Sequence, residues 1–115
     1  MGTILTDVKK ACGITEDYTV FDDQIVMHTN TVLSTLFQLG VGPAGGFEIS
    51  TDGGEQWTDF IESNSKLNMV KTYVGLRVRM LFDPPSSGAM VDAINRQIDE
   101  LTWRINVMVD PTEME

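Results

Sequence analysis

Residues 67–82, LNMVKTYVGLRVRMLF, decide how the rest of the chain is arranged. Their apolar side chains fall into two rows at helical spacing. One row contains Leu67, Val70, Val74, Val78 and Leu81, and the other contains Met69, Tyr73, Leu76 and Met80. At about 100° per residue the rows cover roughly 200° of the helix circumference, more than one partner helix needs. The stretch therefore predicts the central helix of a small bundle.

Arg77 projects into this apolar sector, roughly 20° from Val70 by the same angular count. A guanidinium in such a sector is costly unless it is paired. Two arrangements remain open. The aliphatic stem can lie along the helix and carry the charge to the rim, or Arg77 can meet a carboxylate from residues 11–65 of its own or a neighbouring subunit. The second arrangement makes Arg77 an interface candidate.

The sequence Asp83-Pro84-Pro85 ends this helix, since proline cannot continue the hydrogen-bond ladder. Ser86 or Ser87 is then expected to cap a last helix. Its apolar seam is heptad-like and contains Val91, Ile94, Ile98, Leu101, Ile105 and Met108. Trp103 lies about 120° off that seam, and with Arg104 it is a further interface candidate. Residues 109–115 are expected to form a flexible acidic tail.

Two helices are predicted before the central one. The first contains Ile4, Leu5, Val8, Ala11 and Cys12 at helical spacing, with Gly13 as its C-terminal cap. The second contains Ile25, Thr29, Val32, Leu36 and Leu39, with Asp22 as its N-cap. Gly40 marks its end. Trp57, Phe60 and Ile61 begin a further short helical segment, so the sequence predicts an all-α bundle of four to five helices.

The stretch LGVGPAGG, residues 39–46, matches the G-x-G-x-x-G pattern of dinucleotide-binding loops. Such a loop needs a strand before the glycines and a helix after them, so that the phosphates meet a helix N-terminus. Here a helix comes first, and its C-terminus is the negative pole. We therefore expect a helix cap and a tight ordered turn, and no nucleotide cofactor.

Residues 40–56 form a long connection for so small a chain, and such loops are often functional. Phe47 and Ile49 alternate with polar residues, and Asp52-Gly53 is a hairpin turn signal. The segment is predicted to be a short β-hairpin or an extended arm, ordered chiefly by a neighbouring protein. Its interface candidates are Gly42, Pro43, Phe47 and Ile49, with Trp57 just beyond it.

Composition sets outer limits on the function. The chain has 115 residues, of which 42% are hydrophobic and 22% are charged, as in an ordinary folded domain. Residues 1–108 are expected to form one domain. No apolar run approaches the roughly eighteen residues of a membrane span, and no signal peptide is visible. Cys12 is the single cysteine, so no internal disulfide is expected, and the composition suits a reducing cytosol or an assembly built there.

Charge is unevenly distributed. The net charge is −9, and residues 11–65 contain nine acids but no Lys or Arg. Lys66, Lys71, Arg77 and Arg79 come together, with no acid among them, just before and within the predicted central helix. An acidic solvated surface is one interpretation, and charge-complementary contact between copies is the other. Neither favours a protein that grips phosphate backbones over its whole surface.

The candidates for catalysis are weak. His28 is the only histidine, and its place near an apolar stripe suits packing better than base catalysis. Cys12 lacks a second soft ligand for zinc. Asp22 and Asp23 are explained by helix capping and by the helix dipole. We expect no enzyme activity, no metal and no catalytic residues.

Four stretches, taken together and in order, resemble a known family. They are FDDQIVMHTNTVLSTLFQLGVGPAGGF (21–47), WTDF (57–60), KTYVGLRVRMLFDPP (71–85) and ELTWRINV (100–107). The chain resembles, from about Val20 to Met108, the head–tail connector proteins of siphophages and prophages of Gram-positive bacteria. These are also called head-completion or DNA-packaging adaptors.

The resemblance implies a helical virion protein of the neck, assembled in the host cytoplasm. Its partners would be further copies in a ring, commonly a dodecamer, together with the portal protein and a stopper or tail-completion protein. DNA would pass through the channel without specific binding, and no membrane would be involved. An acidic DNA mimic that inhibits a host DNA-binding enzyme is the alternative, and a small hydrolase is a third class.

Overall fold

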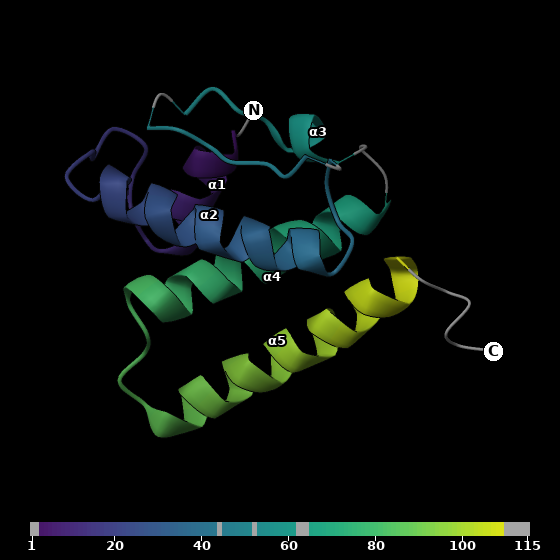
Figure 1. The fold of residues 1–115 in the computed structure, drawn as a ribbon. Helices are drawn as coiled ribbons and strands as arrows, with labels where there is room; N and C mark the ends of the chain where they lie inside the picture. The colour runs from purple at the N-terminus through teal and green to yellow at the C-terminus, as the bar shows by residue number, and fades with distance from the viewer. Residues whose placement is uncertain (1–2, 44, 52, 62–64, 110–115) are drawn as a thin grey trace.

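The computed structural model describes residues 3–43, 45–51, 53–61 and 65–109, and it forms five α-helices over these ranges (Figure 1). In chain order they are α1 (Ile4–Ala11), α2 (Asp22–Gln38), α3 (Trp57–Phe60), α4 (Ser65–Phe82) and α5 (Gly88–Val109). The predicted all-α bundle is confirmed. Residues 110–115 of the predicted acidic tail lie outside the described part.

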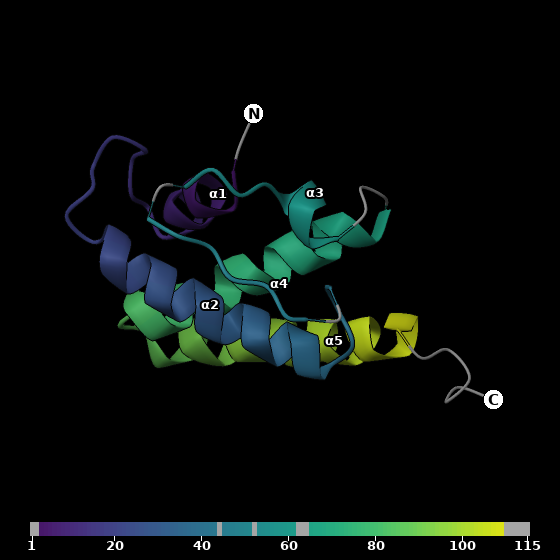
Figure 2. The ribbon, with the colours of Figure 1, turned by 45° about the horizontal axis from the view of Figure 1, so that its top comes forward.

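Helix α4 is the centre of the bundle, as its two apolar rows predict. It packs against α1, α2 and α5, and Figures 1 and 2 show α4 in the middle of the molecule. Val70, Tyr73, Val74 and Val78 are fully buried. Leu81 departs from its row because it lies in the last turn of α4, where 45% of it is exposed. The wide apolar sector thus serves three partner helices.

Helix α5 packs against α4 through the predicted seam. Ser87 is the cap, since its Oγ accepts a hydrogen bond of 3.4 Å from the Met90 amide. Ile94, Ile98 and Ile105 are buried. The side chain of Met108 lies outside the described part. A single buried stripe leaves the opposite face of this 22-residue helix bare.

Glycines end both N-terminal helices as predicted. Gly40 has φ 94° and its amide donates to the Phe37 carbonyl, while the Val41 amide donates to the Leu36 carbonyl. Gly13, with φ 78°, makes the same arrangement at the end of α1. This paired bonding satisfies carbonyls left free in the last turn and needs the left-handed conformation that glycine adopts without strain.

Asp22 is not the N-cap of α2, and that prediction is wrong. The N-cap is Phe21, which makes no side-chain cap bond, and Asp22 is the first helical residue. Its carboxylate lies 2.8 Å from Nζ of Lys9 on α1. The buried ammonium of Lys9 attracts the carboxylate away from the helix end, so a contact between helices replaces the local cap.

The predicted β-hairpin in residues 40–56 is also wrong, because the described residues of this segment contain no strand. Asp52 of the expected turn lies outside the described part. The backbone amide and carbonyl of Ile49 bond to the side chain of Asn30 on α2 instead of to a second strand. The alternation of Phe47 and Ile49 with polar residues directs apolar side chains toward the helices, so the segment lies across the bundle (Figures 1 and 2).

Candidate assembly surface

The glycine-rich turn after α2 packs closely against α3. Gly42 has φ 106°, and a Cβ built on it would lie 2.6 Å from Cε1 of Phe60. The Gly46 amide donates to the Pro43 carbonyl at 2.9 Å, which closes the next turn. Pro43 itself is exposed. These glycines therefore permit backbone turns and a close approach to an aromatic ring.

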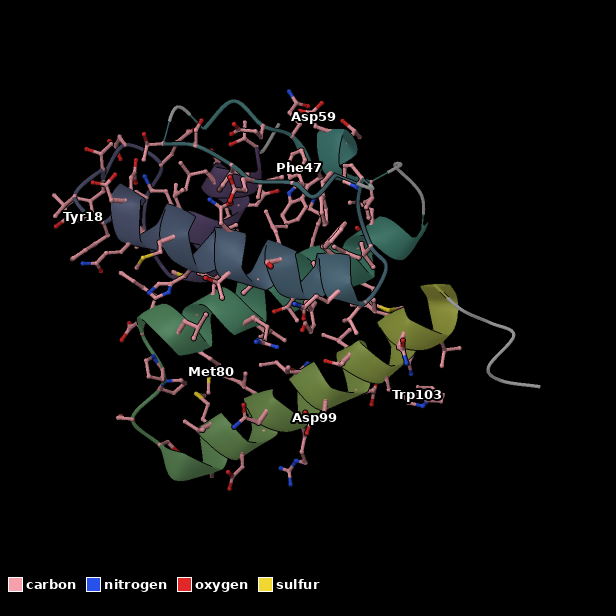
Figure 3. All side chains as sticks on the ribbon, in the orientation of Figure 1. Tyr18, Phe47, Asp59, Met80, Asp99 and Trp103 are labelled. Carbon is pink, nitrogen blue, oxygen red and sulfur yellow. The ribbon has the colours of Figure 1, made fainter. Side chains whose placement is uncertain are left out.

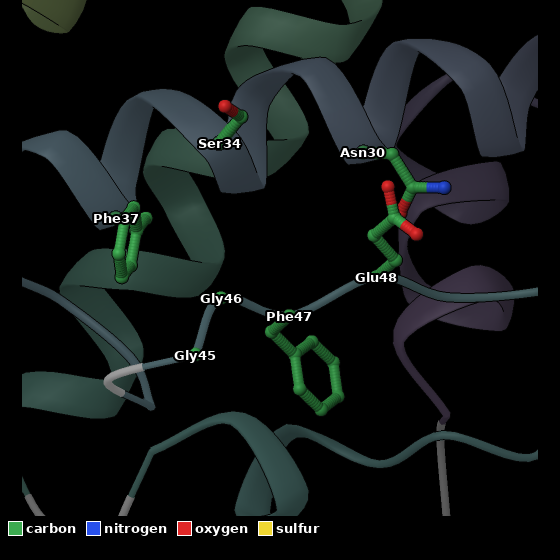
Figure 4. Close-up of a pocket in the computed structure, with 7 residues that line it drawn as sticks. All are labelled: Asn30, Ser34, Phe37, Gly45, Gly46, Phe47 and Glu48. Carbon is green, nitrogen blue, oxygen red and sulfur yellow. The ribbon is translucent and has the colours of Figure 1, made fainter.

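A shallow hollow of about 300 Å³ lies between α2 and residues 45–48 (Figure 4). Phe37 and Ser34 of α2 line one side, and Glu48 lines the other. Phe47 points away from α2 toward Phe60, with ring centroids 5.3 Å apart. The side-chain amide of Asn30 is already hydrogen-bonded to the backbone amide and carbonyl of Ile49, at 2.8 and 3.1 Å. The hollow thus has mixed polar and apolar walls and no pair of groups arranged for acid–base chemistry.

Two of the predicted interface candidates are core residues. Ile49 is 5% exposed and Trp57 is 4% exposed. The indole Nε1 of Trp57 donates to Oδ2 of Asp7 at 2.8 Å, and Nζ of Lys71 lies 3.6 Å from the same carboxylate oxygen. Asp7 thereby ties α1 to α3 and α4. The turn signals in the sequence do not reveal these contacts of Asp7, because Trp57 and Lys71 lie 50 and 64 positions from it in the sequence.

Arg77 is half-buried on α4. The two arrangements predicted for it were a charge carried to the rim and a pair with a carboxylate, and the structure matches neither of them fully. Its Nη1 donates to the Tyr73 hydroxyl at 2.9 Å, and the guanidinium carbon lies 5.6 Å from the centre of that ring. In the described part of the chain, no carboxylate is within ion-pair distance of Arg77. This hydrogen bond satisfies the hydroxyl group of the fully buried Tyr73. A carboxylate partner for Arg77 stays a prediction.

Trp103 and Arg104 lie on the bare side of α5. Trp103 is 58% exposed, and Figure 3 shows it pointing away from the rest of the bundle. Arg104 is exposed and its Nε lies 3.1 Å from Oε2 of Glu100. A large aromatic side chain beside arginine is typical of protein interfaces. The sequence prediction that Trp103 lies off the packing seam is confirmed.

A second exposed apolar surface, which we call the aromatic end, was missed from the sequence. It comprises the exposed Tyr18 and the half-buried Phe21 and Phe82, and Val20 and Leu81, their neighbours in the sequence, are exposed as well. The rings of Tyr18 and Phe21 are 5.9 Å apart, and those of Phe21 and Phe82 are 5.3 Å apart. The available signal was the apolar group at residues 18–21, in the connection before α2. The sequence gives no hint that it meets the last turn of α4.

Lys9 also escaped the sequence analysis. It is 2% exposed, and its Nζ pairs with Asp22 and donates to the Glu16 carbonyl at 2.9 Å. The pair joins α1, the following loop and α2. A lysine on the buried side of an eight-residue helix is rare unless it is paired, and its partner lies thirteen positions along the chain.

The electrostatics of the described surface are mainly acidic. Glu16, Asp17, Asp23, Glu48 and Asp59 belong to the segment without Lys or Arg, and the first three lie in or beside the loop that forms the aromatic end. The predicted basic group of the central helix is partly engaged within the chain, since Lys71 pairs with Asp7 and Arg77 bonds to Tyr73. The side chain of Lys66 lies outside the described part.

Burial raises the pKa of Cys12 from its ordinary value of 9.0 to about 11, because desolvation disfavours the thiolate. The positive charge of Arg79 lowers this pKa, and the carboxylate of Asp83 raises it. A neutral thiol is a poor nucleophile and a poor metal ligand. Cys12 therefore behaves as a packing residue.

Neither a metal centre nor a membrane span emerges from the described residues. Across them, no three His, Cys, Asp or Glu side chains gather where they could hold an ion. The helices within the same part of the chain are all too short or too polar to cross a membrane.

Comparison with known proteins identifies the family. Residues 4–112 match the model of a family described as phage connector protein. Searches among curated proteins and among solved structures gave no match. The match spans all five helices, including the α4–α5 pair and the turn after α2. The chain belongs to the phage connector protein family.

Proposed function

We propose that this protein is a head–tail connector subunit that assembles into a ring below the portal, extends the DNA channel and offers a docking surface to the stopper or tail. A structural role in the phage connector follows from the family match over residues 4–112, which is the observation that carries the proposal. The ring, its position and its neighbours are the proposed part.

Two features of the monomer support assembly. Trp103 on α5 and Val20 in the connection before α2 are 58% and 69% exposed. Large aromatic side chains such as that of Trp103 are enriched at protein interfaces. The candidates Pro43 and Arg104 are exposed as well, and a dodecamer is the expected copy number from the resemblance.

The net charge of −9 supports passage of DNA without specific binding. Proteins that hold DNA tightly do so by neutralising phosphates with Lys and Arg. A channel lined by acids of residues 11–65 would repel the DNA backbone and let it slide. We propose no catalytic function and no cofactor.

Mass spectrometry of purified virions, together with deletion of the coding sequence, tests this function. The protein should be present in the virion, and the deletion should leave DNA-filled heads that carry no tails. The alternative, an acidic DNA mimic, predicts a protein that is missing from virions and co-purifies with a basic host enzyme. Virions with normal tails after deletion would contradict the connector role.

A further inference from the structure

We draw no further inference here: the strongest candidate, the outer face of α5 around the exposed Trp103, carries both arginines and carboxylates, and nothing in the structure shows what covers it.

Discussion

Residues 40–56 and helix α5 show two opposite ways of placing an aromatic side chain. The irregular segment, rich in glycine, leads to Trp57, which is 4% exposed and hydrogen-bonded to Asp7. The regular helix α5 carries Trp103, which is 58% exposed. Irregular backbone is fixed here because distant side chains take up its polar groups, whereas a regular helix satisfies its own backbone and needs to bury only one stripe.

The largest expected effect separates the two tryptophans. Trp57→Ala should lower the free energy of unfolding by about 3–5 kcal/mol, because it empties a buried site and leaves Asp7 without its indole partner. Trp103→Ala should change it by less than about 0.5 kcal/mol. Urea unfolding of both variants measures the difference. Similar losses in the two variants would mean that Trp103 is part of the core.

Gly42 gives the next largest effect. Gly42→Ala should destabilise the protein by about 2–3 kcal/mol, since a side chain at positive φ is strained and the new methyl would meet Phe60. Gly45→Ala is the matched control, because no heavy atom lies within 4 Å of a Cβ built there. Thermal unfolding should show a clear fall in Tm for the first variant only. Equal Tm values for the two variants would show that Gly42 does not pack closely against Phe60 of α3.

Asn30 tests how the irregular segment is held. Asn30→Ala should cost about 1–3 kcal/mol, because the buried backbone groups of Ile49 lose both of their side-chain partners. Amide hydrogen exchange near Ile49 should speed up strongly, while α5 stays protected. Asn95→Ala, an exposed exchange on α5, serves as the control. Unchanged exchange near Ile49 would mean that neighbouring proteins, as the sequence suggested, order this segment.

The smallest expected effect on stability concerns Cys12, the C-cap residue of α1. The reactivity of its thiol reports whether the packing of α1 survives in the variants described above. The folded pKa of about 11 exceeds the ordinary 9.0, so the folded state holds its proton more tightly than the unfolded state. Stability from this group is complete below pH 9 and is lost as the pH rises through 11. At pH 8, iodoacetamide should label the folded thiol about 100-fold more slowly than the thiol in urea, through the thiolate fraction. Equal labelling rates would mean that Cys12 is not desolvated.

The helical part of the fold was predictable because its signals are local. The two apolar rows of α4, the seam of α5 and the capping glycines Gly13 and Gly40 all act within a few residues, and the structure confirms them. The hairpin failed for a physical reason. Alternation at Phe47 and Ile49 reports which side is buried, and it says nothing about whether the covering partner is a strand or a helix.

The site was predictable only in part, since it depends on residues that meet across the bundle. Trp103 could be placed outside the seam by counting angles along one helix. The aromatic end could not, because Phe21 and Phe82 are 61 positions apart and meet only after α2 and α4 pack. Lys9 and Asp22 likewise attract each other between helices, which is why the N-cap prediction for Asp22 failed.

Cryo-electron microscopy of the virion neck is the most direct test of the proposed ring. We expect a closed ring of this helical subunit beneath the portal, with the acids of residues 11–65 facing the channel. A neck whose density has no place for the α4–α5 pair of this chain, in virions that carry tails, would contradict it.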